Sequence, residues 1–289
     1  MVKGDSIKNA QLMLKKLKEM KTLPSIATRL IKMLSDEKTT LEEFESVITM
    51  DPTLVIRLLK FVNSPFYALR TRVTSISEAV AFIGIDNLRN LIVVDALKNL
   101  FKNKNDEQYF SRKRLWMHCV AVAICSQMSM ERIFGQKGED AFLCGIVHDI
   151  GLIIADQVVP DEFLKVCMAW NPKDNKKITQ YENEILHTDH TVIGHNITGD
   201  WKLPISVQNG VKQHHDILSS NEEENKSLPA IVQISDYLVA RLNYSVLHQM
   251  KGELSPSLMI HIRDNIKEYK ALTEDLPEEL SKAEEIYSM

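Results

Sequence analysis

The histidines of this chain are unevenly placed. None of the nine lies before His118, and seven fall between His118 and His215. Two residue types that often bind metal, His148 and Asp149, stand side by side within the apolar run AFLCGIVHDIGLII. A buried carboxylate without a partner costs several kcal/mol, so we expect polar side chains or an ion to meet this pair inside the fold.

Candidate partners for His148 and Asp149 lie in or beside other apolar segments with helical spacing. Any one of them alone would be an ordinary helix residue, but the helices of a bundle can direct several such side chains into one cavity. Imidazole nitrogens and carboxylate oxygens without sulfur suit iron, manganese or zinc. The set that we predict to bind a divalent transition metal comprises His118, His148, Asp149, His190, His214, His215 and Asp236.

The remaining histidines are given other roles. His187 and His195 lie at offsets from His190 that suit one helical face, and we expect them at the rim of the site or behind its ligands. His248 and His261 lie outside the cluster in the sequence and are interpreted as surface residues.

The segments that carry these residues are predicted to be helices. Apolar residues recur at helical spacing, as at Leu54, Leu58 and Val62, and ten glycines and nine prolines are few for 289 residues. Capping patterns predict helix starts at Thr40 with Glu43, at Asp51 before Pro52, and at Ser75 with Glu78. We therefore predict an all-α fold.

A polar segment at residues 101–114 is the predicted junction between two helical units. The first unit would cover residues 1–110, and the second, carrying the histidine cluster, residues 111–289. Because the junction contains no glycine or proline, it is unlike a flexible linker, and we expect the two units to pack against each other.

Composition excludes several classes of protein. A net charge of −4 argues against a broad nucleic-acid-binding surface, and we interpret Lys60, Arg70 and Arg72 as a solvated face. The segment 53–62 is too apolar to read base edges, so no DNA binding is predicted. No uninterrupted apolar stretch approaches the roughly 20 residues that span a bilayer, so we expect a cytoplasmic protein that binds no membrane.

The cysteines are predicted to be reduced core residues. They form no CxxC pair and lie in apolar runs, which favours packing over a thiolate metal site or a disulfide framework. They are Cys119, Cys125, Cys144 and Cys167.

The second half of the chain resembles the HD superfamily, whose members are helical, metal-dependent phosphohydrolases. The order His118, His148-Asp149, Asp236 is similar to that superfamily's H…HD…D signature. His190 followed by Gly194, together with the doublet His214-His215, looks like the fuller ligand set of the HD-GYP subgroup, which hydrolyses cyclic dinucleotides. This resemblance implies a second metal ion, with Asp149 as the bridging ligand and the residue central to any catalysis.

The first half resembles a narrower family, the HDOD proteins. The resemblance is carried by LPSIATRLIKML, by ITMDPTLVIRLLKFVNSPFYALRTRVTSISEAVAFIGIDNLRNLIV and by the later GDWKLPISVQNGVKQHH. It implies an all-α bacterial module of signal transduction in which enzymatic activity is not always retained. Within these blocks we predict that Asn63 and Ser64 hold the turn between two helices.

Two departures from the catalytic HD-GYP pattern bear on function. Leu152 occupies the position after HDIG, where that subgroup usually has a lysine able to hold a phosphate. No GYP sequence lies between His215 and Asp236, and three consecutive glutamates, residues 222–224, would repel an anionic substrate.

These departures favour a regulatory module that keeps a metal site, binds a protein partner, and has little or no hydrolase activity. A nucleotide or phosphate group is a candidate ligand of such a module. The alternative is a working phosphohydrolase for cyclic dinucleotides or other phosphodiesters, in which the metal activates a water. A third interpretation is a metal-free polar network left from an enzyme ancestor.

Overall fold

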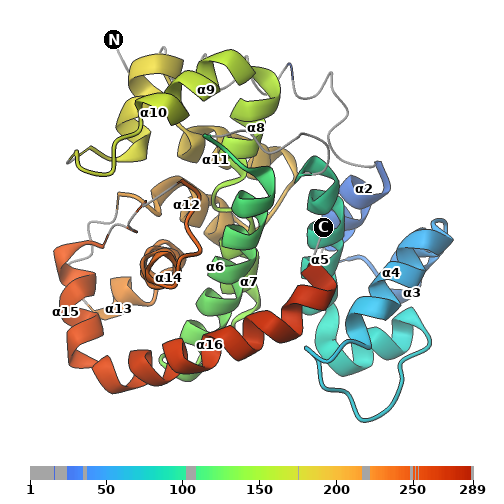
Figure 1. Cartoon of the computed structure of the whole chain (residues 1–289). Helices are drawn as coiled ribbons and strands as arrows, with labels where there is room; N and C mark the ends of the chain where they lie inside the picture. The colour runs from blue at the N-terminus through green and yellow to red at the C-terminus, as the bar shows by residue number, and fades with distance from the viewer. Residues whose placement is uncertain are drawn as a thin grey trace.

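The structure is a computed structural model that describes residues 16, 25–34, 38–101, 109–174, 176–216, 222–247, 250, 252 and 254–287. All regular elements in these ranges are helices, which confirms the predicted all-α fold (Figure 1). The first four helices are α2 (Ser25–Leu34), α3 (Leu41–Ile48), α4 (Pro52–Val62) and α5 (Ile76–Phe101).

Eleven further helices follow α5 in the part of the chain that the structure describes. The first six are α6 (Arg112–Arg132), α7 (Glu139–Val147), α8 (Ile150–Val158), α9 (Pro160–Ala169), α10 (Ile178–Leu186) and α11 (His190–Asp200). The last five are α12 (Ile205–Gln213), α13 (Glu222–Asn225), α14 (Leu228–Arg241), α15 (Pro256–Asp264) and α16 (Ile266–Tyr287).

Side-chain caps fix where the first helices begin. Thr40 Oγ1 accepts a hydrogen bond from Glu43 N at 3.2 Å, and Glu43 Oε2 accepts one from Thr40 N at 3.0 Å. Asp51 Oδ1 accepts from the backbone nitrogens of Thr53 and Leu54, both at 3.0 Å. The two predicted starts of α3 and α4 are therefore confirmed, because each cap satisfies amides that the helix leaves unpaired.

Asn63 holds the chain that follows α4. Its Nδ2 donates to Leu59 O at 2.7 Å and to Val73 O at 2.8 Å, while its Oδ1 accepts from Val73 N at 2.8 Å. The predicted structural role of Asn63 is confirmed by these bonds. The prediction was wrong for the hydroxyl of Ser64, which is buried and has no hydrogen-bond partner among the described residues.

A sharp bend divides α5 at Gly84. The φ of Gly84 is 78°, a left-handed value that glycine adopts without the steric cost of a Cβ. On its two sides α5 packs against α2, α3 and α4 and against α6 and α7. It is thus the element that joins the N-terminal helices to the rest of the molecule.

The two halves are packed together, as expected. Arg89 Nη2, on α5, lies 2.8 Å from Asp140 Oδ1 near the start of α7, and Asn90 Nδ2 donates to Glu139 O at 2.8 Å. One cluster of buried apolar side chains runs from Ala27 to Ala283. The boundary between residues 110 and 111 stays a prediction, because packing does not say whether either unit folds alone.

The second half is built around α6, which packs against α7, α14 and α16 (Figure 1). The segment Glu139–Val158, which contains α7 and α8, is long and apolar enough to cross a membrane, but 89% of its most apolar window is buried inside the fold. The segment therefore belongs to the core of the fold. All four cysteines are buried and form no disulfide with one another, as predicted.

Candidate metal centre

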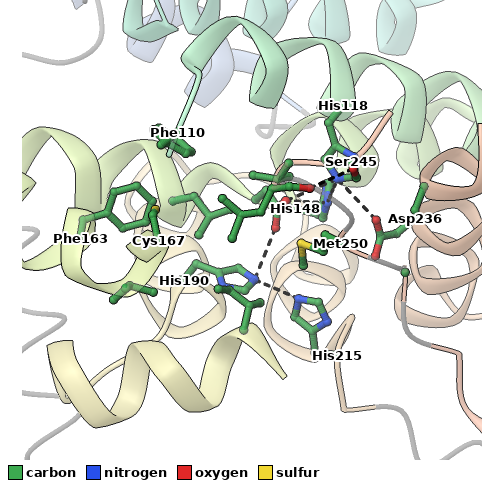
Figure 2. A pocket seen from close by; sticks show the side chains of 18 residues that line it. Phe110, His118, His148, Phe163, Cys167, His190, His215, Asp236, Ser245 and Met250 are labelled. Carbon is green, nitrogen blue, oxygen red and sulfur yellow. Dashed lines mark hydrogen bonds and ion pairs between the residues drawn. The ribbon is translucent and has the colours of Figure 1, made fainter. Parts of the chain in front are cut away.

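Six elements bring the seven predicted metal ligands to one place. His118 lies within α6, His148 and Asp149 form the junction of α7 and α8, His190 begins α11, His214 and His215 directly follow α12, and Asp236 lies on α14. Each of the seven residues is at most 9% exposed. Figure 2 shows the labelled members of this set converging on one cavity.

A glycine allows two of these elements to approach closely. A Cβ on Gly151, in the first turn of α8, would overlap backbone atoms of His190 at the start of α11. With hydrogen in that place, α8 can lie directly against α11. The pair His148-Asp149 is thereby brought beside His190.

Three ligand atoms, from His118, His148 and Asp149 Oδ2, form a first cluster, and Asp236 lies beside it next to His118. His148 Nε2 lies 3.3 Å from Asp149 Oδ2 and 3.3 Å from His118 Nε2. His118 Nε2 is also 3.5 Å from Asp149 Oδ2 and 3.5 Å from Asp236 Oδ1. Asp236 thus meets the first cluster at His118.

The other oxygen of Asp149 faces a second cluster, made of Asp149 Oδ1, His190, His214 and His215. His190 Nε2 lies 3.4 Å from Asp149 Oδ1 and His214 Nε2 lies 3.6 Å from it. His190 Nε2 is 3.4 Å from His214 Nε2 and 3.1 Å from His215 Nε2. Asp149 therefore presents one oxygen to each cluster.

These separations fit the edges of a metal coordination sphere. Ligand atoms about 2.1 Å from an ion lie about 3.0 Å apart when octahedral neighbours and about 3.4 Å apart in a tetrahedron. The distances given above, 3.1 to 3.6 Å, lie in that range or up to about 0.2 Å beyond it. The donor set, nitrogen and oxygen without sulfur, suits iron, manganese or zinc.

In three imidazoles, Nδ1 points away from the clusters and lies within hydrogen-bond distance of a backbone carbonyl oxygen. Nδ1 of His118 lies 2.7 Å from Tyr244 O, that of His148 lies 2.8 Å from Gly145 O, and that of His214 lies 2.8 Å from Val211 O. A carbonyl oxygen can only accept, so each Nδ1 carries a proton and each Nε2 faces the cluster, where a ring without a second proton can offer its lone pair to a cation. Two such lone pairs cannot bond each other, but a cation between them satisfies both.

Glu182 on α10 is a functional candidate that the sequence analysis missed. Its Oε2 lies 2.6 Å from His190 Nδ1 and accepts from His190 N at 3.2 Å, and Glu182 is fully buried. A carboxylate behind a ligating histidine orients the ring and makes it a stronger ligand. A signal was present, since Glu182 shares the apolar face of its helix with Ile178 and Leu186.

Charges around the site shift several pKa values in the metal-free protein. Burial would raise the pKa of Asp149, but His148 and hydrogen bonds with its imidazole neighbours outweigh burial and hold the pKa well below its usual value. Burial would lower the pKa of His190, but the Glu182 carboxylate raises it to about 9. Burial and the neighbouring imidazoles His214 and His190 hold the pKa of His215 well below its usual value.

The histidines outside the set are placed as follows. His187 is exposed, and His195 is half-buried with Nδ1 3.1 Å from Gln208 O, so neither joins the two clusters. His261 is half-buried rather than a free surface residue, because its ring stacks on Phe134 with centroids 5.3 Å apart. His248 lies outside the described residues.

No lysine or arginine is among the described residues that line the cavity at the clusters. Leu152, at the position where the HD-GYP pattern usually has a lysine, is 5% exposed and forms part of the cavity wall. The two clusters therefore supply most of the polar groups among the described residues of the cavity wall.

Fold and site together define an all-α protein of the HD type with a buried double cluster of histidine and aspartate. The chain matches the HDOD domain over residues 20–217, and it belongs to the HDOD domain family. The match includes six of the seven candidate ligands and ends before Asp236.

Solved structures share this fold. An HDOD domain protein of unknown function from Geobacter sulfurreducens is 22% identical, with a TM-score of 0.74 and coverage of 98% of this chain and 99% of that one. A protein from Shewanella amazonensis SB2B, provisionally named a phosphohydrolase, is 23% identical, with a TM-score of 0.69 and coverage of 95% and 96%.

An uncharacterized protein from Treponema pallidum (strain Nichols) is 25% identical over 205 residues. The aligned region covers 70% of this chain and 38% of the relative. The chain thus corresponds to much less than the whole of that protein.

Proposed function

We propose that this chain is a regulatory module of the HDOD family that binds one or two divalent transition-metal ions and has little or no hydrolase activity. The observation that carries the proposal is the direction of Nε2 of His118, His148 and His214, each of which faces a carboxylate oxygen and a neighbouring imidazole nitrogen at metal-ligand spacing. His118, His148 and Asp236 would hold one ion, the residues of the second cluster would hold the other, and Asp149 would bridge the two.

A metal bound here would supply a Lewis-acidic charge and would lower the pKa of a water on it. The described residues of the cavity wall supply little else that phosphoryl transfer needs. Leu152 cannot hold a phosphate, and no lysine or arginine is among the described residues of the cavity wall. We therefore infer that the module keeps a metal site without an efficient substrate site.

A second candidate function is metal-dependent hydrolysis of a phosphodiester, with Asp149 bridging the ions. It is favoured by the grouping of six of the seven candidate ligands and by the provisional name of the Shewanella protein. Turnover of cyclic dinucleotides or of a simple phosphodiester by metal-loaded protein, lost in Asp149→Asn, would establish this alternative.

A signalling module also needs a partner, and we infer that a protein binds the N-terminal half. A groove between α4 and the loop that follows it is lined by Ile56, Leu59 and Leu69. Ile56 is 67% exposed, and the charged residues among the described lining are two cations, Lys60 and Arg72. An acidic segment with apolar side chains fits this groove by charge.

Synthetic acidic amphipathic peptides, compared with basic counterparts, test the partner surface. The acidic peptides should bind, and the double substitution K60E/R72E should abolish binding without changing the free energy of unfolding. Equal binding of both peptide classes would contradict the inference. We further propose that the protein is bacterial and cytoplasmic, and that its two units comprise residues 1–110 and 111–289.

The metal proposal is tested by elemental analysis of protein purified without oxygen or chelator, beside an Asp149→Asn variant. The wild type should retain a transition metal that the variant lacks. Equal and negligible metal in both would support the interpretation of the clusters as a metal-free relic.

A further inference from the structure

The doublet His214-His215 places two consecutive side chains in one cluster. Consecutive residues of an α-helix point about 100° apart, so a doublet in a regular helix would direct its rings to different sides. Here the two rings lie together, with centroids 4.2 Å apart. His215 Nε2 is 3.1 Å from His190 Nε2, and His214 Nε2 is 3.6 Å from Asp149 Oδ1. The second cluster therefore requires the backbone of the doublet to be held in one conformation.

The end of α12 does not hold this backbone by its own hydrogen bonds. The last carbonyl groups of an α-helix have no amide within the helix to accept from, and a buried carbonyl needs a partner. The ring of His214 bonds Val211 O at 2.8 Å, and Gln213 O accepts from Asp216 N at 2.9 Å. The carbonyls of His214 and His215 themselves are bonded by side chains from two other parts of the chain.

Gln233 on α14 bonds the first of these carbonyls. Its Nε2 donates to His214 O at 2.9 Å, and its Oε1 accepts from Ser255 N, directly before α15, at 2.9 Å. A backbone amide can only donate and a carbonyl can only accept, so the orientation of the Gln233 amide is fixed at both ends. Gln233 is 3% exposed and lies one helical turn before Asp236. Helix α14 thus contacts the residues of both clusters.

Lys177, directly before α10, bonds the second carbonyl. Its Nζ donates to His215 O at 2.5 Å and lies 3.3 Å from Asp216 Oδ1. A lysine near the C-terminal end of a helix is also favoured by the helix dipole. Glu182, on α10 itself, bonds the ring of His190. The start of α10 and its middle therefore support two imidazoles of the second cluster, although neither residue is a candidate ligand.

The imidazoles of the first cluster are oriented in another way. Nδ1 of His118 faces Tyr244 O, and Nδ1 of His148 faces Gly145 O. These acceptors belong to the backbone, whereas the second cluster depends on side chains from the region of α10 and from α14. Changes to those side chains should affect one metal position and leave the other intact.

We propose that Lys177 and Gln233 are positioning residues that hold the His214-His215 doublet and thereby set the affinity of the second cluster for its ion. The inference rests on the proposed metal site and goes beyond it, because neither residue belongs to the predicted ligand set. Gln233 also lies outside residues 20–217, the part of the chain that matches the HDOD domain. A protein altered at either residue keeps one ion and binds the other weakly.

Titration of manganese into the metal-free full chain, followed by calorimetry and electron paramagnetic resonance, tests Lys177. In Lys177→Met we expect one of two binding steps to weaken by about 10-fold and the other to stay unchanged. Removing a cation near a metal would by itself tighten binding, so the predicted weakening cannot come from charge. The resonance of a coupled manganese pair should give way to that of an isolated ion. Lys177→Arg, which keeps N–H donors, should restore the second step.

Lys176→Met is the matched control for Lys177→Met. Lys176 is the adjacent residue and its side chain is similarly exposed, but its Nζ bonds Glu184 Oε1 at 2.8 Å instead of the doublet. This variant should keep both binding steps and the resonance of the coupled pair. An unchanged second step in Lys177→Met, or an equal weakening in Lys176→Met, would overturn the role given to Lys177.

Gln233→Glu tests the second support. The new carboxylate can still accept from Ser255 N but cannot donate to His214 O, so the second step should weaken even though an added negative charge would by itself attract the ion. Gln157→Glu removes a comparable donor to a backbone carbonyl, that of Leu100, and should leave both steps unchanged. Equal weakening of both steps in Gln233→Glu, together with a lower free energy of unfolding in urea, would show a general structural role and overturn the assignment.

Two kinds of failure can be told apart in the same titrations. Wild-type protein that binds no manganese overturns the proposed function, and the positioning proposal falls with it. Wild-type protein that binds a single ion, or two ions whose affinities are unchanged in Lys177→Met and Gln233→Glu, overturns the positioning proposal and leaves a metal site standing.

Discussion

Asp149, directly before α8, and His190, the first residue of α11, lie in contact, with Asp149 Oδ1 3.4 Å from His190 Nε2. The other oxygen of Asp149 lies 3.3 Å from His148 Nε2 in the first cluster. One carboxylate thus connects both groups of imidazoles, and the account of the site depends on it more than on any other side chain.

Replacing Asp149 with asparagine should release metal from both clusters. The amide has nearly the same shape, but its nitrogen side cannot ligate and its charge is gone. We expect the variant to lose bound metal, and its melting temperature to become insensitive to chelator, because metal that binds the folded state stabilises it by mass action.

His187→Ala is the control for Asp149→Asn. His187 is exposed and outside the clusters, and it is a better choice than His261, whose ring is stacked on Phe134. A chelator-sensitive melting temperature that survives in Asp149→Asn would contradict the bridging role.

Glu182→Gln should weaken metal binding without removing a ligand. Glutamine can still bond His190 Nδ1 but no longer places a negative charge behind the ring, which we expect to lower metal affinity by about 10–100-fold. Competition with a chromogenic chelator measures this change. Glu184→Gln, on the same helix but paired with Lys176 at the surface, should leave metal affinity unchanged.

Gly151→Ala should disturb the approach of α8 to α11. The new methyl group would overlap the backbone of His190, so we expect a loss of about 1–3 kcal/mol in the free energy of unfolding together with weaker metal binding. Gly199→Ala, where the nearest atom to a new Cβ is a side-chain oxygen of Gln208 at 3.2 Å, should cost less. Equal losses in the free energy of unfolding of the two variants, measured by urea denaturation, would argue against a tight contact at Gly151.

Asn63→Ala should destabilise the N-terminal half. It removes three hydrogen bonds to backbone groups of Leu59 and Val73, and we expect a cost of about 1–3 kcal/mol in urea denaturation. Ser64→Ala should cost little, because the hydroxyl of Ser64 has no partner among the described residues. The opposite ranking of the two variants would contradict this assignment.

The sequence was most informative where polar residues interrupt apolar helices. His118, His148 and Asp236 could be selected because a core position rarely keeps such a side chain without a partner. The helix starts at Thr40 and Asp51 could be predicted because a cap depends on residues two or three positions away.

Other features depend on contacts that sequence spacing does not specify. Glu182 and His190 belong to different helices, and their pairing depends on the turn between α10 and α11, where His187 has a φ of 57°. The edge-to-face contact between Phe110 and Phe163, more than fifty positions apart, likewise depends on how separate segments pack. The hydroxyl of Ser64 was misassigned because a capping residue type does not ensure that an unpaired backbone group lies within reach.

The central claim, that the two clusters bind metal, is tested most directly by the metal content of protein purified without oxygen or chelator. The account predicts more than about half an equivalent of one transition metal per chain, bound by the folded state and absent from Asp149→Asn. Less metal than this in the wild type, with no gain on adding iron, manganese or zinc and no change in melting temperature, would contradict it.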